Sequence, residues 1–230
     1  MQLSNLRKIL VVIAFSILLL QGCNSVKEDR STTAPPADVP KTEPPFANAE
    51  PETYQTEIAV TMATVTERFF AVRKGDKWRI DAAYGDAKQT TSLRTDKEYV
   101  LSTASKIYAE YPTSHGFDES AGTIEEITRG MLNGRGTAVF EKIGTDGGVT
   151  RYRMWGEPGK NLISVISFDE TAGIPVKMEI FKDGDESAAP DVTVQLIGFK
   201  TEVDETLLAI PTDFRRVSIA EMRKVLISAQ

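Results

Sequence analysis

The sequence contains few of the side chains on which enzyme chemistry usually depends. Its 230 residues include one histidine, His115, and one cysteine, Cys23. A histidine-based triad, or a zinc site of the usual His and Cys ligands, needs more of these groups than the chain supplies. A single cysteine also excludes an intrachain disulfide. We therefore expect a protein that is not an enzyme and that holds neither a metal nor another cofactor.

Short motifs for catalysis and phosphate binding are missing as well. No G-x-S-x-G is present, and the NGRG at residues 133–136 lacks the lysine of a phosphate loop. The DGDES at residues 183–187 does not have the spacing of a calcium loop. One enzyme alternative stays open, a hydrolase whose two carboxylates meet only in the folded chain.

The chain has no excess of positive charge and no long hydrophobic run. Its net charge is −6, which argues against nucleic acid as a partner. The longest apolar stretch, Ile9 to Leu20, is shorter than the roughly 20 residues that cross a bilayer as a helix. Because Arg7 and Lys8 precede it, this stretch is typical of an export signal rather than of a permanent transmembrane helix.

The signal ends in Leu20-Gln21-Gly22-Cys23, which resembles the lipobox of bacterial lipoproteins except at Gln21, where a small or apolar residue is usual. The resemblance implies that residues 1–22 are a signal peptide, that the Cys23 thiol takes a diacylglycerol and that the new amino terminus is acylated. Two or more acyl chains suffice for stable membrane anchoring. An ordinary signal peptide with a chance cysteine is the alternative.

Asn24 bears on the choice of membrane. In bacteria with two membranes, an aspartate after the lipidated cysteine commonly retains a lipoprotein on the inner one. Asn24 therefore favours the periplasmic face of the outer membrane, and in an organism with one membrane we expect the cell surface. Residues 23–52 are rich in proline and poor in apolar side chains, which predicts a disordered tether between the anchor and the domain.

Residues 53–230 have the length of one domain and, for the most part, the pattern of β-strands. KWRIDAAY from Lys77, VKMEIF from Val176 and VTVQL from Val192 alternate between apolar and polar side chains, as antiparallel strands with one buried face do. This alternation predicts that Arg79 and Asp81 face solvent. Because turn signals separate such runs, we expect roughly ten strands in a meander.

Two amphipathic helices are predicted. One begins at Thr123, with Glu126 three residues on as in a capping box, and ends at Gly134; the other begins at Ser218, with Glu221 in the same relation. Two helices cannot cover so many strands laid flat. The predicted fold is therefore mainly β (α+β): a strongly curved antiparallel meander sheet that forms a half-open barrel, lidded by one or two helices, with an apolar cavity inside.

Several phrases of the domain are familiar: DKWRIDAAYGD, KEYVLSTASKIYAEYP, VKMEI, a V-x-V-x-L, and GFKTEVDETLLAIPTDFRRVS. Through them the chain, from about Tyr54 to Ser218, resembles the Lol-type carriers, the outer-membrane lipoprotein-sorting proteins and their periplasmic relatives (LolA/LolB-like). The resemblance implies a half-open barrel and a final strand that ends in the phrase at Leu207–Phe214. Carriers of the family hold the acyl chains of lipoproteins, and other relatives bind lipids or sense envelope stress.

Two functional residues known in the family have candidate counterparts in this chain that the sequence alone does not identify. The best-known carrier has an arginine near the start of the domain that helps to hold its lid shut; Arg68 and Arg73 lie in the corresponding strands, and we assign the role to neither. Receptor-type relatives engage the membrane through an exposed apolar loop tip, for which Phe117 is the candidate here.

The resemblance implies a membrane-anchored exported lipoprotein that binds a hydrophobic ligand, the acyl chains of lipoproteins or lipid, in lipoprotein sorting or lipid trafficking. Its partners would be the membrane, through the lipid on Cys23, and those acyl chains or lipoproteins; we expect a monomer. The alternative is a non-catalytic envelope lipoprotein that acts as a protein-interaction module. The expected cavity lining consists of apolar residues of the strands and of the first helix: Val60, Met62, Phe70, Val72, Trp78, Ile80, Ile127, Met131, Met154, Met178, Ile180, Val194 and Leu196.

Overall fold

A computed structural model describes residues 51–112, 139–155, 163–182 and 184–228 of the chain. Some of the predicted features lie outside these residues: the export signal and Cys23, the tether as far as residue 50, His115, Phe117, and the helix over 123–134 with Ile127 and Met131.

The described chain is mainly β, as the sequence predicts. It contains twelve strands, a 3-10 helix named η1 (Glu205–Leu208) and an α-helix named α3 (Ile219–Ser228). The strands are β1 (Thr53–Met62), β2 (Val65–Lys74), β3 (Lys77–Ala82), β4 (Thr90–Arg94), β5 (Glu98–Ser102), β6 (Ile107–Tyr111), β7 (Val139–Asp146), β8 (Val149–Trp155), β9 (Ile163–Asp169), β10 (Ile174–Phe181), β11 (Val192–Lys200) and β12 (Arg215–Arg216).

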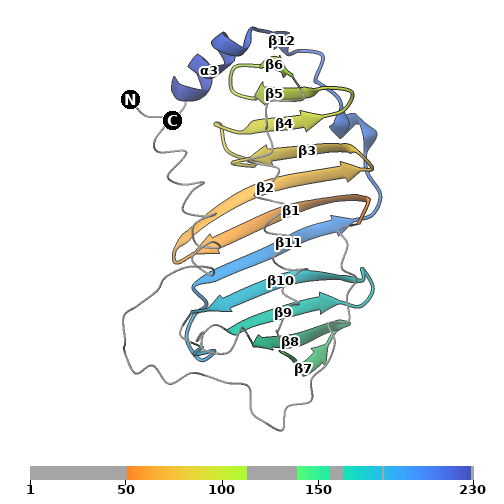
Figure 1. Cartoon of the computed structure of the whole chain (residues 1–230), viewed down its shortest axis with the longest axis vertical. Coiled ribbons are helices and arrows are strands. Elements are labelled where there is room, and N and C mark those ends of the chain that lie inside the picture. The colour runs from red at the N-terminus through yellow and green to blue at the C-terminus, as the bar shows by residue number, and fades with distance from the viewer. Residues whose placement is uncertain (1–50, 113–138, 156–162, 183, 229–230) are drawn as a thin grey trace. The chain divides into compact units, whose positions relative to one another are not determined.

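Hydrogen bonds join the strands in the order β12-β6-β5-β4-β3-β2-β1-β11-β10-β9-β8-β7 (Figure 1). Within the run β1–β6, and again within the run β7–β11, each strand pairs with the next one in the chain. This confirms the predicted meander. Two pairings break this rule, because β1 pairs antiparallel with β11 and β12 pairs parallel with β6. Among the described strands the sheet is open, with β12 and β7 as its end strands.

The described residues form two compact units. Unit 1 contains residues 69–112 and 202–228, and unit 2 contains residues 51–68, 139–155 and 163–201 without residue 183. The boundary between the units falls inside β2, after Arg68.

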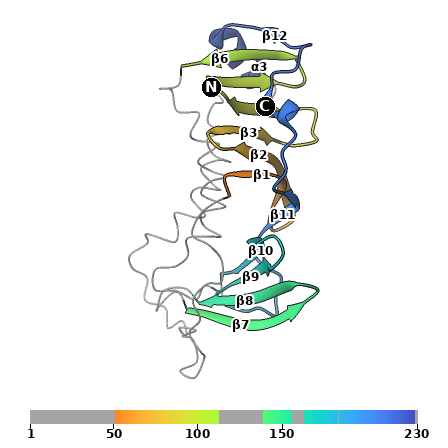
Figure 2. The ribbon, with the colours of Figure 1, turned by 90° about the vertical axis from the view of Figure 1, so that its right-hand side faces the viewer.

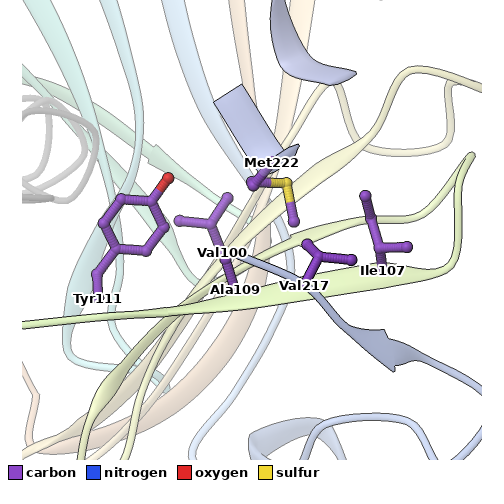
Figure 3. Close-up of a cluster of buried hydrophobic side chains, with 6 residues drawn as sticks. All are labelled: Val100, Ile107, Ala109, Tyr111, Val217 and Met222. Atoms are coloured by element: carbon purple, nitrogen blue, oxygen red, sulfur yellow. The ribbon is translucent and has the colours of Figure 1, made fainter. Parts of the chain in front are cut away.

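In unit 1, helix α3 packs against β5 and β6. Ser218 precedes the helix and its Oγ accepts a hydrogen bond of 3.2 Å from the backbone N–H of Glu221, so the predicted C-terminal helix and its capping residue are confirmed. Met222 is fully buried at the centre of the contact. The buried side chains of this core are Val100, Ile107, Ala109, Tyr111, Val217 and Met222 (Figure 3).

The opposite face of the unit 1 sheet is covered by the segment that follows β11, which Figure 2 shows in blue running past β3 toward β12. Leu208 of η1 packs with Val72, Leu93 and Leu101 of the sheet. The phrase at Leu207–Phe214 is therefore not the end of a strand, as the resemblance implied. It begins within η1, whose start is capped by a hydrogen bond from Thr206 N–H to the Asp204 side chain, and it is irregular from there up to β12.

Asp81 of β3 does not face solvent, as the alternation of its strand predicted. Its side chain is 2% exposed. Arg79 Nε donates to Asp81 at 2.9 Å, and Arg79 Nη1 donates to the carbonyl oxygen of Leu207 at 3.0 Å. The prediction was wrong because the covering segment lies on the polar side of β3 and needs hydrogen-bonding partners there.

Candidate apolar ligand site on the unit 2 sheet

The registers of unit 2 place apolar side chains on one face of its sheet, in rows that run across the strands. We call this face, which holds the two rows listed below, the apolar face. Row 1 consists of the cross-strand partners Val60, Val194, Met178, Ile166 and Tyr152. Row 2 consists of Met62, Val192, Ile180, Ser164, Met154 and Phe140.

The two rows differ in how far they are buried. Every member of row 1 is buried, and Ile166 has no exposed surface. In row 2, Met62, Val192, Ile180 and Met154 are only partly buried. Row 2 therefore presents apolar side chains with accessible surface, two of them methionines, whose flexible thioethers adapt to varied apolar partners.

The other face of the same strands, called the polar face, carries the ion pairs of unit 2 together with buried apolar side chains such as Val165 and Trp155. Arg153 Nη1 donates to Glu141 Oε2 at 2.6 Å, and Arg153 also pairs with Glu186; its pKa is raised, first by the Glu186 hydrogen bond. Lys177 Nζ donates to Glu179 Oε1 at 2.7 Å. The two faces of the unit 2 sheet therefore differ in that the ion pairs lie on one face and the two rows lie on the other.

The β1–β2 hairpin shows the same division between faces. Thr61 Oγ1 and Thr66 Oγ1 lie 2.9 Å apart, and Arg68 Nη1 donates to Glu57 Oε1 at 2.9 Å. These four residues therefore share the polar face. Since successive side chains of a strand alternate between faces, Glu67 lies on the apolar face.

Glu67 is the acidic side chain that stands out on that face. It makes no hydrogen bond or ion pair with the described residues. Its pKa is raised above the ordinary value because burial disfavours the charged carboxylate. A hairpin in which Thr61 faces Thr66 puts Glu67 beside Val60, at the β2 end of row 1.

The predicted lining residues are divided by the structure into three sets. Seven share the apolar face of unit 2: Val60, Met62, Met154, Met178, Ile180, Val194 and Leu196. Four belong to unit 1, where Phe70 and Val72 lie under the covering segment and Trp78 and Ile80 lie on the opposite side of the sheet. Those four therefore do not form one surface with each other. Ile127 and Met131 lie outside the described residues.

Sequence reasoning missed five members of the rows: Phe140, Tyr152, Ser164, Ile166 and Val192. The signal for Ile166 was present, because ISVISFD at Ile163–Asp169 is a nearly continuous apolar run, as expected of a strand buried on both faces. Val192 stands in the VTVQL alternation. Glu67 was missed because the sequence of β2 does not show that Arg68 has an ion-pair partner whereas the adjacent Glu67 has none among the described residues.

The described residues offer little for other chemistry. They contain no group of three His, Cys, Asp or Glu side chains that could hold a metal ion. Two buried polar atoms in this part of the chain lack a hydrogen-bond partner, Oε2 of Glu98 in unit 1 and Nε1 of Trp155 in unit 2. Over the same residues, no helix is both long and apolar enough to cross a bilayer.

Comparisons with known proteins place the chain in no family. No protein-family model matches it, and no curated protein matches it in sequence. Solved structures with a similar chain trace include an uncharacterized conserved protein from Thermus thermophilus, at 11% identity and a TM-score of 0.42, over 73% of this chain and 91% of the other.

Two further similar structures carry names. The complex of MucA and MucB from Pseudomonas aeruginosa matches at 11% identity and a TM-score of 0.40, over 73% of this chain and 59% of the other. A LolA superfamily protein from Nitrosomonas europaea matches at 10% identity and a TM-score of 0.28, over 69% of this chain and 90% of the other. At such identities and TM-scores these are likenesses of the chain trace, from which no activity is inferred.

Proposed function

We propose that this chain is an exported, membrane-anchored lipoprotein that binds the acyl chains of a lipid or lipoprotein on the apolar face of unit 2, in lipoprotein sorting or lipid trafficking. The observation that carries the proposal is row 2, in which four apolar side chains, Met62, Val192, Ile180 and Met154, are only partly buried. Binding of this kind requires no catalysis, and we propose none.

The dimensions of the rows support an acyl chain as the occupant. Row 1 crosses five strands, and neighbouring strands lie about 4.8 Å apart, so the row is roughly 19 Å long. An acyl chain laid along row 2 would contact Met62, Val192 and Ile180, pass Ser164 of β9 and then contact Met154. Each CH₂ group that it buries contributes about 0.8 kcal/mol.

Strand β11 offers a matched pair of variants to test the proposal. Val192 lies in row 2, paired with Met62, whereas Ile197 of the same strand pairs with Glu57 on the polar face and is 39% exposed. We expect lipid to be extracted by organic solvent from the purified full chain and from Ile197→Gln, and to be detected by mass spectrometry. Val192→Gln should lose most of it.

Circular dichroism of each variant checks that the fold is kept. Absence of lipid from the wild-type chain, together with failure to bind the uncharged apolar dye Nile red, would overturn the proposal. Recovery of a stoichiometric protein from intact cells by crosslinking at Val192, without lipid, would favour the alternative of a protein-interaction module.

The membrane anchor is a separate part of the proposal and has its own test. We expect Cys23 to incorporate an alkyne-labelled fatty acid in growing cells, and Cys23→Ser to lose both the label and the membrane fraction. Labelling of Cys23→Ser at the wild-type level would disprove the anchor, while leaving the acyl-binding face untouched. Cell fractionation in the same experiment assigns the membrane.

A further inference from the structure

Glu67 is a charged group in a place that disfavours charge. It lies on the apolar face of unit 2, and burial raises its pKa. A partly buried carboxylate without a partner destabilises the folded chain, because it loses hydration and gains no hydrogen bond in return. Its position calls for a partner that the described residues do not provide.

The charged groups nearby cannot be that partner. Arg68 is adjacent in β2 but faces the other way and is held by Glu57. Val60 and Met62 of β1 and Val65 of β2, which share the face with Glu67, are apolar. Among the described strand residues of unit 2 on this face, the cation is Lys142 of β7, which pairs with Tyr152 at the far end of row 1. Six strand spacings, roughly 29 Å along the sheet, separate it from Glu67, well beyond the screening length of about 8 Å at physiological salt.

We propose that Glu67 accepts a hydrogen bond from the polar end of the bound ligand. The ligand is then a long-chain amphiphile whose polar end carries an N–H donor, an amine or an amide, and not a carboxylate or a phosphate. This inference rests on the proposed function, since it assigns the head-group end of the same apolar face. The acyl chain lies across β1, β11, β10, β9 and β8, and the donor group lies at the β2 end.

The chemistry of the Glu67 carboxylate decides which polar head group it prefers. A carboxylate is an acceptor only, so it binds an ammonium or amide N–H and repels an anionic head group. Hydrogen bonds to a charged group are stronger than neutral ones, the more so away from bulk water. The ligand therefore supplies the hydrogen bond that Glu67 lacks, and the carboxylate discriminates between ligands with the same chain.

Competition between two amphiphiles of equal chain length tests the inference. Nile red bound to the full chain is displaced with dodecylamine or with dodecanoate, each below its micellar concentration and at physiological salt. In the wild-type chain we expect dodecylamine to displace the dye at about tenfold lower concentration, the effect of one charge-assisted hydrogen bond. The ratio of the displacing concentrations, dodecanoate over dodecylamine, should fall toward one in Glu67→Gln. In Glu67→Lys it should fall below one.

Glu202→Gln is the matched control, because it removes the same charge from an exposed position of unit 1. It should keep the wild-type ratio, which separates the site from the general attraction of an acidic protein for amines. Equal or better displacement by dodecanoate in the wild-type chain, or a ratio that Glu67→Gln leaves unchanged, would overturn the inference alone. Failure of every amphiphile to displace the dye, or of the dye to bind, would overturn the proposed function and this inference with it.

Discussion

Arg79 and Asp81 form a two-point ion pair inside unit 1. Arg79 Nε donates to both carboxylate oxygens of Asp81, at 2.9 and 3.1 Å, and Thr91 Oγ1 donates to Asp81 Oδ1 at 2.5 Å. Because Arg79 also donates to the carbonyl of Leu207, the pair attaches the covering segment to β3.

Removal of the buried carboxylate should therefore loosen unit 1. Asp81→Ala leaves the guanidinium of Arg79 without its anion, and we expect the free energy of unfolding to fall by about 3 kcal/mol. Urea denaturation followed by circular dichroism measures the change. Asp76→Ala, in the exposed turn before β3, should change it by less than about 0.5 kcal/mol; equal effects of the two substitutions would contradict the assigned role.

Met222 should be the most sensitive position of α3. Its side chain is fully buried among Val100, Ile107 and Val217, so Met222→Ala leaves a cavity. We expect a loss of about 3 kcal/mol in the free energy of unfolding. Ile227→Ala, on the same helix but 43% exposed, should cost less than about 1 kcal/mol and is the control for helix propensity.

Glu110 should titrate below the ordinary range of glutamate. Lys97 Nζ donates to its Oε1 at 2.7 Å, and Arg216 Nη2 donates to its Oε2 at 2.7 Å. The Lys97 hydrogen bond is the main reason why the pKa of Glu110 is lowered, and the charge of Arg216 adds to it. A lowered pKa means that the stabilisation is present above the ordinary pKa and is lost as the pH falls through the folded value.

Carbon-detected NMR titration of the side-chain carboxyl measures this pKa directly. Lys97→Met should raise it toward the ordinary value, while Lys88→Met, in an exposed turn, should not. A Glu110 pKa that is unchanged in Lys97→Met would show that the hydrogen bond does not form in solution.

Glu67→Gln should make the chain more stable at neutral pH. Because burial raises the pKa of Glu67 in the folded chain, the ionised form is penalised on folding, and the amide removes that penalty. The gain should vanish at acidic pH, where the wild-type carboxyl is protonated in both states. Thermal unfolding midpoints at the two pH values test this, with Glu202→Gln expected to change neither. A lower midpoint of Glu67→Gln at neutral pH would contradict the assigned environment.

Local sequence pattern predicted the elements well and the surfaces that they bury less well. The alternation from Lys77 gave the right strand, and Ser218 with Glu221 gave the right helix start. The prediction that Asp81 of β3 faces solvent was wrong. Alternation identifies a solvent-exposed face only where no other segment covers that face. Here an irregular segment distant in sequence covers it, and such coverage leaves no periodic signal.

The same limit applies to the candidate site. The alternation of their strands predicts that Met178 and Val194 are buried, and the cross-strand register then shows that they are neighbours. Phe70 and Trp78 looked equivalent in sequence, yet they lie on opposite faces of unit 1. Register and face are set by pairing between distant segments, which a single sequence does not reveal.

The pairing of β1 with β11 has a consequence for how the chain acquires its structure. Strand β1 must wait for β11, which is made more than a hundred residues later, and unit 1 likewise takes its covering segment and α3 from residues 202–228. Such distant closures slow folding and leave edge strands exposed meanwhile. A chain that is interrupted before Val192 would therefore present the bare edge of β1 to other molecules, and late truncations should cause aggregation rather than a partly active product.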